Sequence, residues 1–496
     1  MIYPPAAAAP RGLPEPPPAA VLVRQSYYPW LVVAVCCTGA FIGQLDASIV
    51  QLALPALETK FHAKLHVVSW VAIGYQLAFA AILPVYARLA EIRGRKLFFL
   101  AGFALFGLFS LLCGMAETLW QLILFRVLMG LSGAALGANS VVIMVKAVGP
   151  ERQGHAMGIF AAAQAVGISV GPLVGGLLLG ELGWRWVFWV TVPFAVLAAA
   201  AGWVTVPRTT DLNADRRFDM AGALVLIPAL TALLLLISES YAWGLTSPPL
   251  IACAVLVLVL FPWFIRREGR TGAPLVDLAL FRAPAFSGGV IAIVMSYALL
   301  YGMFFLMSFA FVRGYRDDPL TAGLRLAIVP VTLGIVAPFT GALRTRFGLM
   351  PLLLGGMAIC AAAGIALALC MDGTPGSLRM VMVTLAVFGL GLGLFIAPNN
   401  SETLSAAPAD HRGQAGGMLN LMRTFGTSFG VACASALLTW RLARLANFTG
   451  RTSDVSEQAL LSAVSDGMYL LIAFAVLAAV MSVLRGGASD ATGKAA

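Results

Sequence analysis

Long apolar segments alternate with short polar ones along almost the whole chain. Each apolar segment can cross the hydrocarbon core of a membrane, about 30 Å thick, as a single helix. The pattern predicts fourteen such helices, with approximate ranges 29–54, 67–86, 97–116, 121–147, 155–180, 186–206, 220–242, 249–265, 285–312, 319–343, 350–371, 378–398, 414–440 and 460–484. We therefore predict an all-α integral membrane protein.

The composition supports this prediction and excludes a soluble globular protein. Of the 496 residues, 60% are hydrophobic and 11% are charged, whereas soluble domains carry about 25% charged residues. The seven cysteines lie within apolar segments, so neither a disulfide framework nor a zinc site is expected. His62 and His66 have the spacing of helical metal ligands, but only Glu58 could join them, and we predict no metal site.

The positive charges indicate how the helices are oriented. If both termini are cytoplasmic, the inner loops and tails hold twenty of the 32 Lys and Arg residues, and the outer loops hold nine. Basic residues collect on the cytoplasmic side of membrane proteins. We therefore predict a multi-pass protein of the cell inner (plasma) membrane with both termini cytoplasmic. The formal charge of +10 then reflects topology, and no nucleic-acid binding is expected because the basic residues are spread over short loops.

One helix occurs twice in the chain. Residues 154–171 align with residues 413–430, and six aligned pairs are identical. The copies differ where Gln164 falls opposite Arg423 and where Pro172 falls opposite Val431. Small residues repeat along one face of the first copy and would let a neighbouring helix approach closely, with ordinary tight packing as the alternative explanation. These residues are Gly167, Gly171 and Gly175.

Two of the ionisable residues that are predicted to lie within membrane spans are in the first half of the chain and of opposite charge. Asp46 lies deep in the first span, and Arg126 lies near the outer end of the fourth. An unpaired charge at such a depth costs several kcal/mol, so residues of this kind are candidates for function. Asp46 is the candidate for binding and releasing a proton. The alternatives are a structural ion pair between Asp46 and Arg126, and an Arg126 side chain that extends to the membrane interface.

A short basic turn occurs between spans 2 and 3 and returns between spans 10 and 11. The second copy, GALRTRFG, runs from Gly341 to Gly348 and has Thr345 where the first has an acid. Equivalent turns in the two halves predict a duplicated cytoplasmic gate, and the alternative is a simple orientation signal. The gate residues of the first turn are Arg88, Glu91, Gly94, Arg95 and Lys96.

Five segments together resemble the major facilitator superfamily and, within it, the fourteen-helix drug/proton antiporters. The segments are LDASIVQLALP (45–55), the turn at 87–96, GISVGPLVGG (167–176), WRWVFWVTVP (184–193) and NLMRTFGTSFGVA (420–432). GISVGPLVGG is similar to the antiporter signature of the family's fifth span. Glu91 stands where the turn motif usually has Asp, and Ser48 and Gln51 stand where the span 1 motif usually has Thr and Asn. These departures leave the substrate open.

The resemblance implies the arrangement of the chain. Two six-helix bundles, 29–206 and 285–484, would face each other across a central cavity, with two inserted spans and cytoplasmic linkers at 207–284. Residues 1–28 would form a disordered cytoplasmic tail because the segment is rich in Pro and Ala, and residues 485–496 a second cytoplasmic tail. Glu239, near the outer end of the first inserted span, is expected to act as an interfacial anchor rather than as a proton site.

The resemblance also implies roles for the candidate residues. Asp46 and Arg126 would couple transport to protons, and the small residues of span 5 would pack against span 10. The residues implied to line the substrate cavity are Gln164, Asn420 and Arg423, and those implied in the packing are Gly167, Gly171, Pro172, Gly175 and Gly176.

These inferences predict a proton-coupled exporter of amphipathic small molecules or drugs that works by alternating access. No cofactor is expected beyond the coupling protons. The expected partners are the small-molecule substrate and the lipid bilayer, and a periplasmic adaptor protein could join them. The alternative is a dedicated exporter of one endogenous metabolite or siderophore. A membrane receptor or a membrane-embedded enzyme is disfavoured because the sequence has no Ser/His/Asp or HExxH constellation and no phosphate loop.

Overall fold

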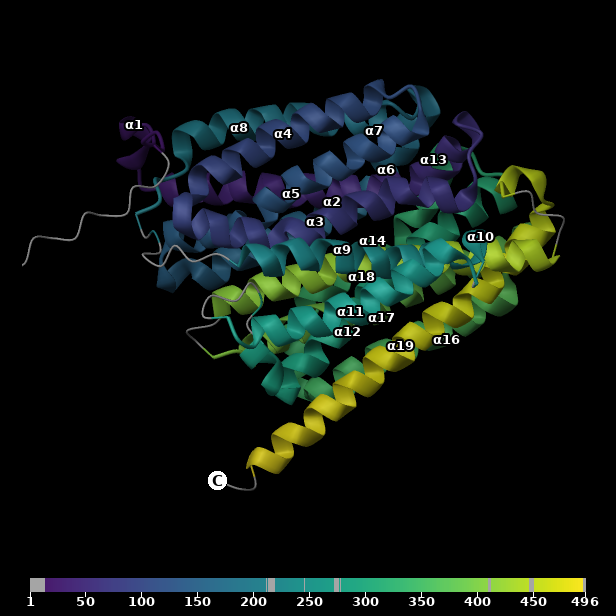
Figure 1. The fold of residues 1–496 in the computed structure, drawn as a ribbon. Helices are drawn as coiled ribbons and strands as arrows, with labels where there is room; N and C mark the ends of the chain where they lie inside the picture. Colours follow the sequence, from purple (N-terminus) through teal and green to yellow (C-terminus); the bar gives the residue numbers. More distant parts are fainter. Residues whose placement is uncertain are drawn as a thin grey trace, which may run out of the picture.

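The described part of the chain consists of helices joined by short connections (Figure 1). The computed structural model describes residues 14–210, 212, 219–244, 246–271, 276, 278–408, 412–445 and 450–493. Within these residues, 14 helices are long and apolar enough to cross a membrane. The predicted all-α fold with fourteen spans is confirmed.

The first six spans form one bundle. Gly94, between the second and third spans, has a φ of 115°, which favours glycine because a side chain would be strained there. The fourth span begins at a capping box in which Thr118 and Gln121 satisfy each other's backbone N–H groups. The helices are α2 (Tyr28–Lys60), α3 (Leu65–Arg93), α4 (Arg95–Met115), α5 (Leu119–Val148), α6 (Gln153–Glu181), α7 (Trp186–Trp189) and α8 (Thr191–Thr205).

The last six spans form a second bundle. Span 10 is broken into short pieces, and Pro338, which has no backbone N–H to donate, lies at the start of the 3₁₀ turn η4 (Ala337–Phe339) that separates two of them. The helices are α12 (Pro284–Phe309), the π-helical turn η3 (Ala310–Gly314), α13 (Pro319–Leu326), α14 (Ile328–Val336), α15 (Thr340–Phe347), α16 (Leu349–Cys370), α17 (Pro375–Ser405), α18 (Arg412–Leu445) and α19 (Glu457–Gly493).

The inserted spans are α9 (Met220–Ser238) and α11 (Pro248–Glu268), joined through α10 (Ser240–Trp243). They pack against each other, and α9 also contacts α3 of the first bundle and α18 of the second. Figure 1 shows α9 lying between these two helices. The insertion therefore covers one of the lines along which the bundles meet.

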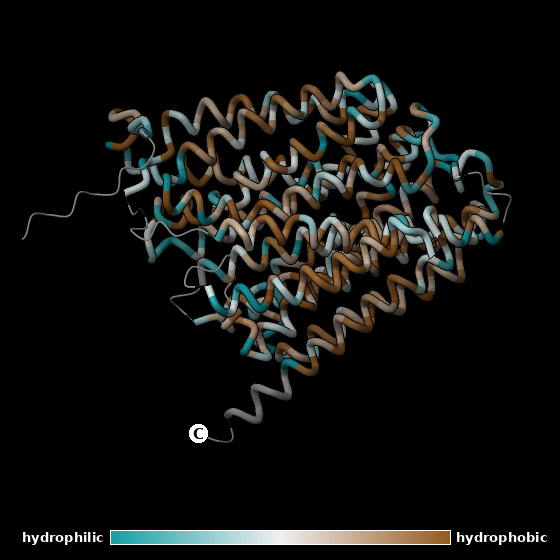
Figure 2. Tube along the Cα trace, viewed as in Figure 1, coloured by the Kyte–Doolittle hydropathy of each residue, from teal (hydrophilic) through white to brown (hydrophobic). Residues whose placement is uncertain are grey.

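Hydrophilic residues gather at the two ends of the assembly, and hydrophobic residues fill the helices between them (Figure 2). We call the end that holds Arg93, Arg208 and Arg266 the basic end, and the end that holds Lys60 and Gly183 the far end. α2 runs from the basic end to the far end, and each following span reverses direction. The described parts of both terminal segments therefore lie at the basic end.

Four pairs of helices make the main contacts between the two bundles. α3 packs against α18, α6 packs against α13 and α14, and α2 packs against α12. Within the first bundle α2 packs against α6, and within the second α12 packs against α18 and α19. α2 and α6 are thus in contact with each other and with the opposite bundle.

The small residues of α6 contact two different helices. Gly167, Gly171 and Gly175 lie against α2, and a Cβ atom at Gly171 would overlap the Ser48 side chain. Gly176 lies against α13, where an added Cβ would be 2.5 Å from the carbonyl oxygen of Pro319. The expectation that this face packs against span 10 therefore holds for Gly176 and for the backbone of Pro172, which meets Gly323 of α13. It is wrong for the three glycines that face α2, because two faces of α6 carry small residues.

The N-terminal segment is folded where the structure describes it. Ala20–Val23 form the short helix α1. Glu15 accepts hydrogen bonds from the backbone N–H groups of Lys96 at 2.9 Å and Thr209 at 2.6 Å. The prediction that residues 1–28 are disordered is therefore wrong from residue 14 onward, because this acid caps the start of α4. Residues 1–13 lie outside the described residues.

Hydrogen bonds join the bundles at the far end. Glu58 of α2 accepts from the backbone N–H of Thr452 at 2.6 Å and also from its hydroxyl. The backbone N–H of Leu65 donates to the carbonyl oxygen of Gly450 at 2.8 Å, and Arg313 donates to the Thr59 hydroxyl. Glu58 is 1% exposed, so these contacts exclude water. The far end is closed.

The halves of α6 and α18 that lie toward the basic end have open space beside their glycines. Gly154 and Gly158 in α6, and Gly416 and Gly417 in α18, have no neighbouring atom within 4 Å of the position that a Cβ would take. Further along α6, Gly176 is in tight contact with the backbone of α13 in the opposite bundle. The bundles therefore approach closely toward the far end and leave space toward the basic end.

We predict that Glu58→Ala loosens the far end. The substitution leaves two buried donors of Thr452 unpaired, which costs about 2 kcal/mol and corresponds to a roughly thirtyfold change in the population of the closed state. Spin labels at the exposed positions Lys60 and Ser453 should then report longer and broader distances than in the parent protein. Glu457→Ala is the matched control, because the ion pair of Glu457 with Arg316 stays within the second bundle. Unchanged distances in the Glu58 variant would contradict the proposed closure.

Candidate functional site

Asp46 and Arg126 form a buried ion pair in the first bundle. The Nη1 atom of Arg126 donates to both carboxylate oxygens of Asp46, at 2.8 and 2.7 Å. Its Nε donates to the carbonyl oxygen of Val71 at 2.9 Å, and the Tyr75 ring lies 4.2 Å from the guanidinium carbon. The pair therefore links α2, α5 and α3.

The environment of the pair excludes contact with lipid. Asp46 is 0% and Arg126 is 1% exposed. A buried charge pair is tolerated when its hydrogen-bonding groups are satisfied, but removal of one partner leaves an uncompensated charge. The structure thus contains the Asp46–Arg126 ion pair that was predicted as an alternative to a proton-binding role for Asp46. It contradicts an Arg126 side chain extended to the membrane interface, because Val71 and Asp46 hold the guanidinium inside the bundle.

The turn of α2 that carries Asp46 also contacts two other elements. Two residues further on, Ser48 lies against Gly171, and its hydroxyl is 3.4 Å from the carbonyl oxygen of Gly167. Gln44 accepts a hydrogen bond from the hydroxyl of Tyr301 in α12 at 3.4 Å. A displacement of this turn would therefore change its contacts with α5, with the small-residue face of α6 and with the second bundle.

Gln164, Asn420 and Arg423 are brought together midway along α6 and α18. The Nη1 atom of Arg423 donates to Oε1 of Gln164 at 2.9 Å, and Nη2 donates to Oδ1 of Asn420 at 2.5 Å. The Tyr297 ring of α12 lies 5.8 Å from the guanidinium carbon. Gln164 and Arg423 occupy equivalent positions of the two sequence copies. The two repeated helices therefore contact each other through residues at the same position of the repeat.

The electrostatics of the two bundles differ. Arg423 has no carboxylate within 4.0 Å among the described residues, whereas Arg126 is matched by Asp46. α12 and α17, which correspond in order to α2 and α5, carry Ser, Thr and Asn as their buried polar residues and no buried charge. Among the described residues of α12 and α17, the Asp46–Arg126 pair thus has no counterpart, and α18 contributes Arg423, a positive charge without a carboxylate partner, to the interface.

The residues of the predicted cytoplasmic gate lie at the basic end. Arg88 donates to Glu91 at 3.0 Å, and the backbone N–H of Arg95 donates to the Thr209 hydroxyl at 2.8 Å. Lys96 differs from the expectation, because its Nζ points into the first bundle and donates to the carbonyl oxygens of Trp203 at 3.0 Å and Val206 at 2.7 Å. Lys96 therefore caps the C-terminal end of α8 and does not face the opposite bundle.

The second copy of the gate turn has an acid that the sequence comparison missed. Arg344 forms an ion pair with Glu402 of α17 at 2.6 Å. Thr345 stands where the first turn has an acid, but a carboxylate from another helix supplies the charge. No spacing in the sequence could have paired residues that lie in different spans.

Glu239 holds the inserted spans against the first bundle. It accepts a hydrogen bond from the indole N–H of Trp70 at 2.7 Å, and His66 lies 3.7 Å away. Burial raises the pKa of the Glu239 carboxyl, because removal of water disfavours the charged form. Glu239 is 4% exposed and so anchors a helix contact rather than an interface with lipid headgroups.

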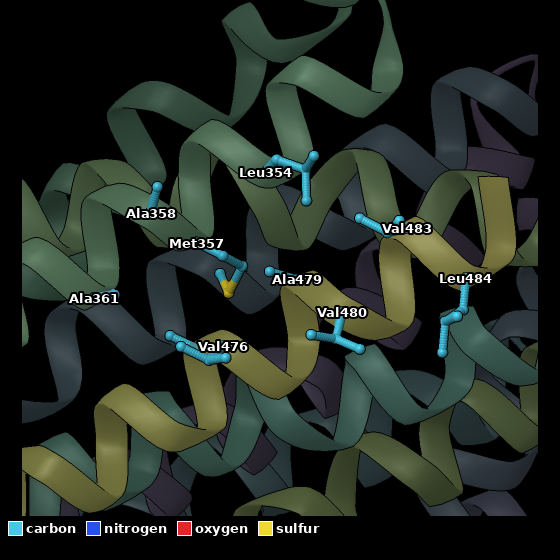
Figure 3. Close-up of a pocket in the computed structure, with 10 residues that line it drawn as sticks. Leu354, Met357, Ala358, Ala361, Val476, Ala479, Val480, Val483 and Leu484 are labelled. Atoms are coloured by element: carbon cyan, nitrogen blue, oxygen red, sulfur yellow. The ribbon is translucent and has the colours of Figure 1, made fainter. Parts of the chain in front are cut away.

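Figure 3 shows a shallow groove on the second bundle, between α16 and α19. Its volume is about 390 Å³, and all its lining residues are apolar. It includes neither Asp46 nor Arg423, and it offers no group for ion or proton chemistry. Its lining residues are Leu354, Met357, Ala358, Ala361, Ala475, Val476, Ala479, Val480, Val483 and Leu484.

Comparisons with known proteins agree with the fold. The chain matches the family described as the Major Facilitator Superfamily over residues 36–431. It is 94% covered by a crystal structure of a bacterial homologue of the human lysosomal transporter Spinster, in an inward-facing and unoccupied conformation, with a TM-score of 0.65, 16% identity and 98% of that chain covered.

Curated relatives extend along most of the chain. "Multidrug resistance protein Stp" of Mycobacterium tuberculosis is 32% identical over 82% of this chain and 75% of the relative. "Tetracenomycin C resistance and export protein" of Streptomyces glaucescens is 30% identical over 84% and 77%. "Riboflavin transporter RibZ" of Clostridioides difficile is 28% identical over 86% and 91%. The relatives and the fold are those of transporters and not of enzymes, and the chain belongs to the Major Facilitator Superfamily, with drug exporters among its relatives.

Proposed function

We propose that this protein is a proton-coupled exporter of amphipathic small molecules across the cytoplasmic membrane. The observation that carries the proposal is the buried Asp46–Arg126 pair on a turn of α2 that also packs against the glycines of α6. Relatives named as multidrug resistance and tetracenomycin C export proteins support the direction of transport. The similarity of residues 167–176 to an antiporter signature supports exchange for protons.

The orientation follows from the charge distribution. Arg93, Arg208 and Arg266 lie at the basic end, and basic residues favour the cytoplasmic side of a membrane. We assign the basic end to the cytoplasm, which places both termini there. The closed far end then faces outward, and the loosely packed basic halves of α6 and α18 open the middle of the interface inward. This arrangement is the inward-facing state of an alternating-access cycle.

Protonation of Asp46 would change the contacts of its turn. A neutral carboxyl cannot hold the charge of Arg126, so the link between α2 and α5 weakens when the proton binds. Because Ser48 and Gln44 on the same turn contact α6 and α12, α2 would shift relative to both. A proton that moves inward gains about 2.3 kcal/mol for each 100 mV of membrane potential, which can drive export against a gradient.

Asp46 is sealed from water in the inward-facing state described above. Proton exchange therefore requires a second state in which the packing of α2 against α5 and α3 loosens. The tight contact between Gly176 and α13 would open in that state, since it closes the far half of the interface. Proton binding and opening of the far end then occur in the same conformational change.

A dedicated transporter of one metabolite is the second candidate. It is favoured by the riboflavin transporter, whose length the chain covers to 91%. The two functions differ in the range of compounds transported. An uptake and resistance panel with tetracenomycin C, riboflavin and ethidium, with and without a protonophore, separates them because an exporter of drugs acts on several unrelated compounds.

We predict that Asp46→Asn abolishes proton-coupled transport without preventing membrane insertion. The asparagine cannot bind or release a proton and leaves Arg126 unmatched. In inverted vesicles that hold a pH gradient, a panel compound exported by the parent protein should release protons, and the variant should match vesicles without the protein. Asp372→Asn is the control, because Asp372 is exposed at the far end. Proton release equal to that of the parent would refute the role of Asp46.

We predict that Gly171→Ala reduces transport roughly five- to 150-fold, the range that corresponds to an overpacking cost of about 1–3 kcal/mol in one state of the cycle. The new methyl group would overlap Ser48, so α6 and α2 could not approach. Ser48→Gly combined with Gly171→Ala should restore part of the activity. Gly180→Ala in the same helix is the control, because no atom lies within 4 Å of its added Cβ. Normal transport by Gly171→Ala would remove the packing argument.

A further inference from the structure

We propose that Arg423 binds two acceptor oxygens of a planar aromatic substrate, so that the site selects neutral or anionic, carbonyl-rich aromatic compounds over cations. The inference rests on the proposed transport function and names the substrate class of its central site. It depends on the geometry of one guanidinium group, on the charges around it and on the aromatic residues beside it.

The guanidinium group of Arg423 holds two carbonyl oxygens. Nη1 donates to the Gln164 amide oxygen at 2.9 Å, and Nη2 donates to the Asn420 amide oxygen at 2.5 Å. Both acceptors are uncharged, and they lie on different bundles. A guanidinium is a planar fork that can bind two neighbouring acceptors at once. The site is therefore built for a pair of carbonyl-type oxygens, which the protein's own amides occupy.

The charge balance disfavours cations. Among the described residues no carboxylate lies within 4.0 Å of Arg423. Of the other arginines within the spans, Arg126 pairs with Asp46 and Arg325 pairs with Asp317. Arg485, at the basic end of α19, donates to the Asn399 amide oxygen at 2.8 Å. Asp46 cannot serve a cationic substrate in this state because it is buried and bound to Arg126. A substrate at the middle of the interface thus meets one unmatched positive charge, whose effect is strong away from bulk water.

One tyrosine of α12 lies beside the guanidinium, since the Tyr297 ring is 5.8 Å from Cζ of Arg423. Tyr301, one turn further on, donates to Gln44. Residues spaced by four lie on the same face of a helix, so Tyr301 shares the face of α12 that carries Tyr297. An aromatic wall beside a cation suits a flat ring system that carries acceptor oxygens at its edge.

Substrate binding at this position would also separate the bundles. The hydrogen bond of Arg423 to Gln164 joins α18 to α6, whereas its bond to Asn420 stays within α18. A substrate oxygen that replaces the Gln164 amide therefore removes a direct link across the interface while it satisfies Arg423. Substrate recognition and the release of α6 are therefore coupled, because the substrate oxygen replaces the Gln164 oxygen as the acceptor for Arg423.

Binding measurements on the purified full-length protein in lipid nanodiscs test the proposal. The acceptor-rich probes are riboflavin, tetracenomycin C and 1,8-dihydroxyanthraquinone, and the matched planar cation is ethidium. We expect the parent protein to bind at least one of the acceptor-rich probes more tightly than ethidium. Arg423→Gln should weaken that binding about tenfold or more, because a charge-assisted pair of hydrogen bonds is lost, and should not weaken ethidium binding.

Two further variants define the mechanism. Arg423→Lys keeps the charge but loses the fork, and it should bind the acceptor-rich probe more weakly than the parent and more tightly than Arg423→Gln. Arg444→Gln is the control, since Arg444 is exposed on the last turn of α18. Monodisperse elution and unchanged melting temperatures verify that the variants are folded.

Several results would overturn the inference. These are tighter binding of ethidium than of all three acceptor-rich probes, equal binding of the acceptor-rich probe by the parent and Arg423→Gln, or binding of that probe by Arg423→Lys as tight as by the parent. Because no proton gradient is present in nanodiscs, these outcomes are independent of coupling. If the selectivity holds but Asp46→Asn still releases protons, the proposed function fails and the substrate class stands.

Discussion

The ion pair between Asp46 and Arg126 is the interaction on which the first bundle is organised. Two opposite charges are held without water between α2, α5 and α3, and each satisfies the hydrogen-bonding groups of the other. Such a pair is stable only while both partners stay ionised and in register. The first bundle therefore contains a structural element whose stability changes with a single proton, placed where α2 meets α6 and α12.

The second bundle lacks a corresponding pair and contributes a different group. Its charge midway through the membrane is Arg423, which binds amides from both halves of the chain. The two bundles thus divide the chemistry, because the first holds the carboxyl group that we propose to exchange a proton and the second holds a positive charge without a carboxylate partner. In the proposed mechanism, substrate binding and protonation therefore occur at separate atoms and influence each other through the movement of helices.

The fold could be predicted from the sequence because membrane spans depend on local composition. The fourteen apolar segments, the glycine turns at Gly94 and Gly348, and the family resemblance required no knowledge of distant contacts. The site was predicted less completely, because Glu402, Tyr301 and Thr452 acquire their partners from spans far away in the chain. The fold of the N-terminal segment was missed for the same reason: Glu15 has a role only because Lys96 and Thr209 lie beside it.

The position of α9 makes the perimeter of the transporter asymmetric. α9 covers the contact between the bundles along α3 and α18. A hydrogen bond from Trp70 to Glu239 holds the far end of α9 in place. No such helix covers the contact between α6 and α14 among the described residues, and Val166, which is 50% exposed, and Ile335, which is 61% exposed, lie on these two helices. A lateral path for an apolar compound between the bundles would consequently meet less protein along α6 and α14 than along α3 and α18.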